Sequence, residues 1–167
     1  MYIVNSRILI TLGFAALTAP VLADDCTSVK NAMLNSGHTP HNVLVTKTDA
    51  KGKKTVTRQV QTVDNKYVQT PDGKWHAMNI AIKDLNNDLS GIQTCRRGGS
   101  ESVGGESTAV YDVHMNLEGT LSDNRVWVSA QNRVLKSEAV IEGVHYTTEY
   151  DFGHVTPPAN AVSMGGK

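Results

Sequence analysis

The sequence predicts an α+β domain that is mainly antiparallel β: a curved sheet or unclosed β-barrel with one or two short helices packed on its concave side. Three observations lead to this fold class. Segments that alternate apolar and polar residues recur along the chain, most clearly over 109–117, and such alternation is typical of strands with one dry face. Short runs rich in Asn, Asp, Gly and Pro separate these segments, as they do in hairpin connections. Helical spacing is confined to two short stretches, one before Gly37 and one between Asn79 and Gly91.

The first 23 residues have the order of a secretory signal peptide. A single positive charge precedes the apolar run Ile8–Leu17, and small residues then lead to a cleavage point after about Ala23. The apolar run is too short to span a membrane, which takes roughly 20 such residues. The alternative, a buried N-terminal helix, is disfavoured because the acidic pair Asp24-Asp25 changes the composition abruptly. We therefore expect a periplasmic or secreted protein.

One domain is expected after cleavage. Residues 24–156 have the length of an ordinary domain and suffice to bury a core, and the pair Pro157-Pro158 opens a flexible tail over 157–167. The chain has 16 basic and 16 acidic residues, a balance that suggests neither nucleic acid nor an anionic membrane surface as a partner. After the signal peptide no stretch is apolar enough for stable membrane insertion.

The two cysteines, Cys26 and Cys95, both lie in the mature part of the chain. An exported protein meets an oxidising compartment, so a disulfide between them is expected. The bridge would close a loop of about 70 residues and stabilise the fold by roughly 4 kcal/mol. The alternative of free or metal-binding thiols lacks the local Cys-x-x-Cys spacing.

The first half of the domain predicts a helix followed by a meander of strands. Thr27 or Ser28 can cap the helix, and Val29, Ala32 and Met33 fall at helical spacing. The strands expected next cover 41–49, 55–63, 67–70 and 75–78, with turns at 51–54, 64–66 and 71–74. Apolar residues three and four apart predict a second short helix between 79 and 91.

The second half predicts an antiparallel meander of about four strands. The glycine-rich stretch from Cys95 to Gly105 is interpreted as a loop with a bend or bulge in a strand. In the strand over 109–117, Tyr111, Val113 and Met115 share one face and polar residues occupy the other. Further strands are expected over 125–130, 134–142 and 144–152.

No catalytic or metal-binding constellation emerges from the sequence. The six histidines show no spacing that brings three or four ligands to one point, as a zinc site requires. Ser100 and Ser102 lack the Gly-x-Ser-x-Gly elbow of hydrolases, and the paired glycines around them lack the lysine of a phosphate loop. The acidic residues of the last strands alternate with apolar ones, which is typical of the wet side of a sheet. We therefore expect no catalytic residue, no metal ligand and no cofactor.

Large apolar and aromatic side chains can be aligned on strand faces of the second half. In a small sandwich they would fill the core, whereas in an incomplete barrel with helices in its mouth they would line a hydrophobic pocket. The candidate pocket-lining residues are Tyr111, Val113, Met115, Trp127, Tyr146, Tyr150 and Phe152.

With this order in view, the chain resembles the LolA-like family of periplasmic lipoprotein carriers and related lipid-binding proteins. The likeness rests on the signal peptide, the N-terminal helix, the meander and the helical insertion, together with a terminal passage and the entry into it from Cys95. That passage reads Arg125-Val126-Trp127-Val128-Ser129, then Leu135-Lys136-Ser137-Glu138, then Thr148-Glu149-Tyr150-Asp151-Phe152. The resemblance implies an unclosed β-barrel with helices in its opening, lipid or lipoprotein acyl chains as ligands, and no catalysis.

Two hypotheses follow for the function. The first is a periplasmic protein that shields an apolar ligand, such as a lipid or an acyl chain, inside its curved sheet. The alternative is a non-catalytic module of the cell envelope whose sheet engages another envelope protein. An enzyme with an unrecognised site is the third and least favoured interpretation.

Overall fold

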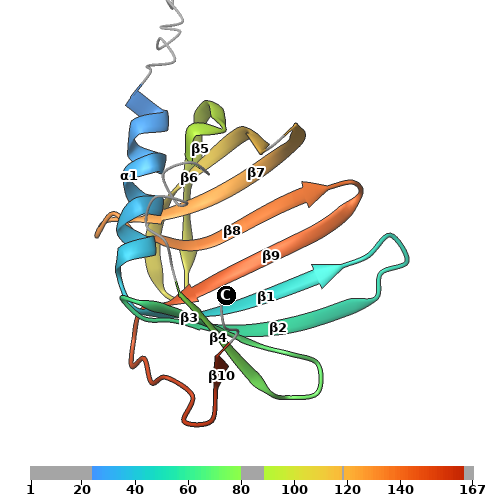
Figure 1. Cartoon of the computed structure of the whole chain (residues 1–167). Helices are drawn as coiled ribbons and strands as arrows, with labels where there is room; N and C mark the ends of the chain where they lie inside the picture. Colours follow the sequence, from blue (N-terminus) through green and yellow to red (C-terminus); the bar gives the residue numbers. More distant parts are fainter. Residues whose placement is uncertain (1–23, 80–88, 118, 164–167) are drawn as a thin grey trace, which may run out of the picture.

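The computed structural model describes residues 24–79, 89–117 and 119–163, and the elements that lie wholly within these residues are one helix and the strands of one sheet (Figure 1). Helix α1 spans Asp24–His38. The strands are β1 (His41–Thr48), β2 (Lys54–Gln61), β3 (Asn65–Gln69), β4 (Trp75–Asn79), β5 (Ile92–Val103), β6 (Glu106–Leu117), β7 (Thr120–Ser129), β8 (Val134–Ile141), β9 (Val144–Asp151) and β10 (Val162–Ser163).

All ten strands belong to one sheet, in the order β10-β4-β3-β2-β1-β9-β8-β7-β6-β5. Every neighbouring pair is antiparallel except β10 and β4, which are parallel. The long-range step is the pairing of β1 with β9, which joins the first half of the chain to the last hairpin (Figure 1). Within the described residues β5 and β10 are the two edges, so the sheet is not closed.

The predicted fold class is therefore confirmed. Helix α1 packs against a single curved, mainly antiparallel sheet. The two-sheet sandwich, which the sequence pattern of the aromatic residues also allowed, is not formed by the described residues. The predicted second helix over 79–91 falls almost wholly outside the described residues. The segment expected to be a flexible tail contains β10, whose Val162 pairs with His76; its flexibility stays a prediction.

Helix α1 forms where the sequence places apolar residues at helical spacing. Val29 and Ala32 are fully buried, and Met33 packs against the same core. The amide of Thr39 donates to the Asn35 carbonyl at 3.1 Å and closes the last turn, just before Pro40, which cannot continue a helix. The predicted face of the helix is thus the one that contacts the sheet.

The glycine-rich stretch after Cys95 is a strand rather than a loop. β5 runs through it to Val103, and its register with β6 shifts between Arg97 and Gly99, so the expected bulge is present. The turn is restricted to Gly104 and Gly105, with φ of 58° and 85°. Two consecutive positive φ values are what a tight two-residue hairpin turn needs, and glycine adopts them without strain.

The alternation of the strands divides the sheet into two faces. On the helix face, which packs against α1, Tyr111 of β6 lies opposite Val126 of β7. On the outer face, Val110 lies opposite Trp127. The buried core on the helix face comprises Val29, Ala32, Leu89, Ile92, Cys95, Tyr111, Val113, Met115, Val126, Val128 and Val134.

The predicted disulfide links the helix to this core. Cys26 of α1 and Cys95 of β5 are bonded, with their Cα atoms 5.0 Å apart and a sequence separation of 69. A carboxylate oxygen of Asp25 also accepts a hydrogen bond from the Arg97 amide at 3.0 Å. The first turn of α1 is therefore fixed to β5 by both a covalent and a polar contact.

Candidate functional site

Two of the hollows in the described part of the chain lie on opposite faces of the sheet. The first, which we call the cleft, has a volume of about 370 Å³ and lies between α1 and the helix face of the sheet. The second, which we call the groove, has a volume of about 710 Å³ and crosses the outer faces of β5 to β9. Both volumes fall in the range of roughly 300–1,000 Å³ that is usual for small-ligand sites.

Apolar and polar side chains share the lining of the cleft, and they come from the helix and from strands that are distant in sequence. Helix α1 supplies Met33, and β1 supplies Val43 and Val45. The complete lining is Met33, Ser36, Gly37, His41, Val43, Val45, Gln59, Gln61, Lys66, Leu89, Met115, Val134, Thr148 and Tyr150. Among the described residues that line it there is no carboxylate.

The helix wall of the cleft is held in place by hydrogen bonds, of which those of Ser36 are buried. The Ser36 hydroxyl donates to the Ala32 carbonyl and accepts from the Val134 amide of β8, both at 2.8 Å. Asn35 donates through its side-chain amide to the Asn132 carbonyl in the β7–β8 turn at 2.9 Å. These contacts join the C-terminal half of α1 to β8, so the cleft has a wall that is formed without a ligand.

His41 lies at the polar side of the cleft and is 3% exposed. Its Nδ1 is 2.6 Å from the Thr39 carbonyl oxygen; a carbonyl only accepts, so this geometry assigns the proton to Nδ1. Burial lowers the pKa of His41, the bond to Thr39 opposes this, and the charge of Lys66 lowers the pKa further. The imidazole is thus favoured in its neutral form.

Lys66 and Tyr150 complete the ionisable lining of the cleft. Burial lowers the pKa of the Lys66 ammonium and raises the pKa of the Tyr150 phenol, with a hydrogen bond to Ser137 as the smaller, opposing cause. The His41 ring contacts the rings of Tyr150 and Phe152, with centroids 5.6 and 5.2 Å apart. Lys66 is the single lysine among the described lining residues, and we call it the cationic corner of the cleft.

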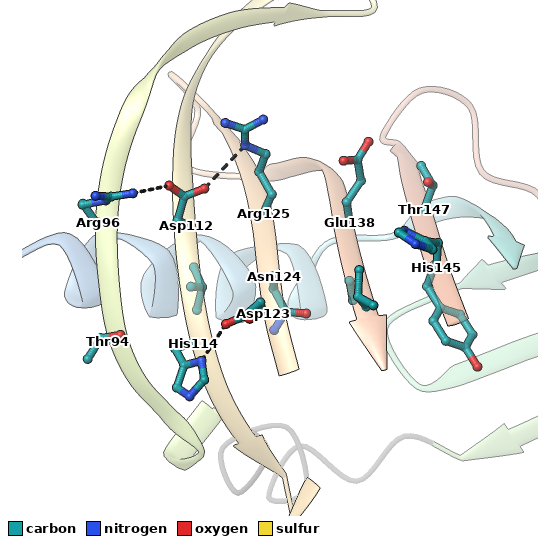
Figure 2. Close-up of a pocket in the computed structure, with 14 residues that line it drawn as sticks. Thr94, Arg96, Asp112, His114, Asp123, Asn124, Arg125, Glu138, His145 and Thr147 are labelled. Carbon is teal, nitrogen blue, oxygen red and sulfur yellow. Dashed lines mark hydrogen bonds and ion pairs between the residues drawn. The ribbon is translucent and has the colours of Figure 1, made fainter. Parts of the chain in front are cut away.

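The groove on the outer face is polar. Figure 2 shows the Asp112 carboxylate between two guanidinium groups, 3.2 Å from Arg96 Nη2 and 3.5 Å from Arg125 Nε. Nearby, His114 Nδ1 lies 2.7 Å from an Asp123 carboxylate oxygen. These pairs are substantially exposed, and exposed ion pairs add about 0–1 kcal/mol each to stability. Their chemistry suits recognition of a polar surface more than stabilisation of the fold.

Trp127 borders this outer face and not the cleft. It is 2% exposed, its indole Nε1–H donates to a Glu101 carboxylate oxygen at 2.8 Å, and the Lys136 ammonium lies 4.5 Å from its ring. Arg125 lies 5.8 Å from the same ring. This arrangement differs from the expectation that Trp127 and the tyrosines share one pocket, because the register puts Trp127 opposite Val110 rather than Tyr111.

The other six predicted pocket-lining residues are divided among several places. Met115 and Tyr150 line the cleft, whereas Tyr111 and Val113 are buried in the core beside α1. Tyr146 lines the groove, and Phe152 lies under the Arg133 guanidinium at 4.7 Å. His41 and Lys66 of the cleft were not predicted as site residues from the sequence, and the only signal for Lys66 was its place next to a β-like segment.

Within 24–79, 89–117 and 119–163, no three His, Cys, Asp or Glu side chains come together in a way that could hold a metal ion. In the same part of the chain, no helix has the length and apolar character to cross a bilayer.

Comparisons with known sequences give no family. No family model matches the chain, and no curated protein matches it.

Solved structures, in contrast, share the fold. The lipoprotein LppX of Mycobacterium tuberculosis is 14% identical, with a TM-score of 0.53, and the match covers 83% of this chain and 98% of LppX. The MucA/MucB complex of Pseudomonas aeruginosa contains a chain that is 13% identical, with a TM-score of 0.51, over 81% of this chain and 59% of that one. LolA superfamily proteins are among the structural neighbours, one of them from Nitrosomonas europaea at 11% identity, 80% and 92% coverage and a TM-score of 0.36.

These likenesses concern the fold alone. The unclosed sheet with a helix against it, which the resemblance to the LolA-like family implies, is present in this chain, and LppX has a related fold over nearly its whole length. The match with the MucA/MucB complex spans about three-fifths of the matched chain.

Proposed function

We propose that this is an exported periplasmic protein that binds an apolar ligand, such as a lipid or an acyl chain, in the cleft beside α1. The observation that carries the proposal is the cleft itself. It has a volume of about 370 Å³, its walls include Met33, Val43, Leu89 and Met115, and α1 is fixed to β8 beside it. A preformed wall lowers the ordering cost of binding.

The free energies of burial and of association favour a long acyl chain as the ligand. Each methylene removed from water contributes about 0.8 kcal/mol, whereas association costs about 4–15 kcal/mol in lost freedom. A ligand with about ten buried methylenes therefore gains roughly 8 kcal/mol, which only matches that cost. Long acyl chains fit this balance better than short ones.

A paired substitution tests the cleft. Val45→Trp places an indole in the cleft, whose lining includes Val45, while Val140→Trp makes the same change in the groove, where Val140 is 41% exposed. The protein is purified from a membrane-containing lysate and its mass is measured under native conditions, and cis-parinaric acid is then titrated. We expect a lipid mass and probe binding in the wild type and in Val140→Trp, and a large loss of both in Val45→Trp. A clean apo mass together with no probe binding by the wild type refutes the proposal.

The second candidate function is an interaction module of the cell envelope that engages another protein through its sheet. The polar groove favours it, because Arg96, Asp112 and Arg125 present paired charges on the outer face. The likeness to a chain found in a MucA/MucB complex adds support. In this case an envelope protein co-purifies with the wild type and with Val45→Trp but is lost from Val140→Trp. Equal recovery with all three proteins contradicts a role for the groove.

A further inference from the structure

Lys66 occupies an unusual position for a lysine. It is half-buried and belongs to the lining of the cleft on the helix face, and burial lowers its pKa. Among the described residues no ion pair or hydrogen bond involves this ammonium, and no carboxylate lines the cleft. Buried or half-buried lysines ordinarily have an acidic partner, because an unpaired charge away from water is costly. The cationic corner of the cleft therefore lacks a counter-ion within the chain that the structure describes.

The groups around Lys66 cannot supply that counter-ion. The Nδ1–H of His41 is already donated to Thr39, and the side-chain amide of Gln61 donates to the Gly37 carbonyl. The Lys66 charge is close enough to His41 to lower the pKa of that imidazole. An anion placed here would balance the ammonium and remove this repulsion.

We propose that the cleft binds a long-chain fatty acid, with the carboxylate of the ligand at Lys66 and its alkyl chain along the wall formed by Met33, Leu89, Met115 and Val134. This inference rests on the proposed function of the cleft and specifies the head group of the ligand. The single ammonium at the corner matches a monoanion, and a carboxylate is fully ionised near pH 7. A neutral head group would leave the ammonium unpaired, and a phosphate monoester carries close to a second negative charge that no other lysine or arginine among the described lining residues balances.

The experiment compares three ligands that share one alkyl chain. Radiolabelled palmitic acid, methyl palmitate and hexadecyl phosphate are tested by equilibrium dialysis against the wild type, Lys66→Met and the control Lys54→Met. Lys54 is an exposed lysine of β2 outside the cleft lining. We expect the wild type and Lys54→Met to bind the acid about ten-fold or more tightly than the ester, because a charge-assisted hydrogen bond is lost with the ester. We expect Lys66→Met to bind both with similar affinity.

A further variant covers the case in which Lys66→Met does not fold. Lys66→Arg keeps the charge and should keep the preference for the acid. The ratio of the affinities for acid and ester is also measured on the wild type, and this measurement requires no variant. Equal binding of acid and ester by the wild type overturns the head-group assignment but leaves acyl binding in the cleft intact. Tighter binding of hexadecyl phosphate overturns the choice of a carboxylate. No binding of any of the three ligands overturns both the head-group assignment and the proposed function.

Discussion

Removing the Cys26–Cys95 disulfide should destabilise the protein strongly while leaving its sheet folded. The bond closes a loop with a sequence separation of 69 residues. In the chain-entropy model, opening such a loop lowers the free energy of unfolding by about 4 kcal/mol, since the unfolded chain regains that freedom. For a chain of this size the loss corresponds to a fall in Tm of about 10 °C. Alanine is the replacement of choice, because Cys95 is buried in the core and a serine hydroxyl there would lack a partner.

The assay is urea unfolding followed by far-ultraviolet circular dichroism. We expect Cys26→Ala/Cys95→Ala to keep the β signal and to unfold at a lower urea concentration. The wild type with a reductant provides the matched control, since Cys26 and Cys95 are the only cysteines of the chain, and it should show a similar loss. Thiol titration of the denatured, unreduced wild type should find no free sulfhydryl. A fall of less than about 1 kcal/mol in the free energy of unfolding of both samples would refute the reasoning, because opening the loop would then add little entropy to the unfolded state.

Three further predictions concern single side chains. Ser36→Ala should lower the free energy of unfolding by about 1–3 kcal/mol in urea titrations, because the buried Val134 amide loses its acceptor; an unchanged midpoint would show that this bond does not hold α1 to β8. In a Trp75→Phe background, Trp127 should emit at the short wavelengths of a buried indole and should not respond to an acyl probe in the cleft, since it lies on the outer face; a response would contradict that placement. Burial holds the pKa of His41 below 6.5 in the folded protein, so the unfolded chain binds the extra proton as the pH falls below about 6.5. The free energy of unfolding should therefore decrease below that pH, and His41→Gln should flatten the decrease. Parallel plots of the free energy of unfolding against pH for the two proteins would exclude this contribution.

Local patterns in the sequence were sufficient to predict most of the strands. The hairpin of β1 and β2 and the strands β8 and β9 follow from alternating residues bounded by turn residues, which act over a few positions. The pairing of β1 with β9 has no such local signal, since Val43 and Tyr150 are brought together only by the whole topology. The curved, unclosed sheet was therefore predictable as a class, and its strand order was not.

The face of Trp127 was not predictable for a physical reason. The four residues Val126–Ser129 of β7 are all buried, so a period of two does not distinguish the helix face from the outer face. A register shift in the pairing of β7 with β8 falls between Trp127 and Val128 as well. Where both faces of a strand are covered, composition cannot indicate which side chains share a pocket.

The cationic corner of the cleft was missed because the local sequence around Lys66 is typical of a turn. Asp64, Asn65 and Lys66 were assigned to a connection, whereas the structure places Lys66 in β3, opposite Gln61 and Met78. A lysine in a turn is expected to be exposed. Lys66 is half-buried instead, and the residues that line the cleft with it include His41 and Gly37, which are far from it in sequence.

The two candidate functions use opposite faces of the same sheet, and this makes them separable by mutation. Along β9, Tyr150 lines the cleft, whereas Glu149 pairs with Lys136, the neighbour of Trp127 on the outer face. A bulky residue added to one face leaves the lining of the other in place, so Val45→Trp and Val140→Trp each serve as the control for the other. The fold cannot decide between the functions, because LppX and a chain of the MucA/MucB complex have related folds. The decision lies in side chains that the fold does not specify, and the assignment of the ligand's head group rests on Lys66, a half-buried lysine of the cleft lining that has no acidic partner among the described residues.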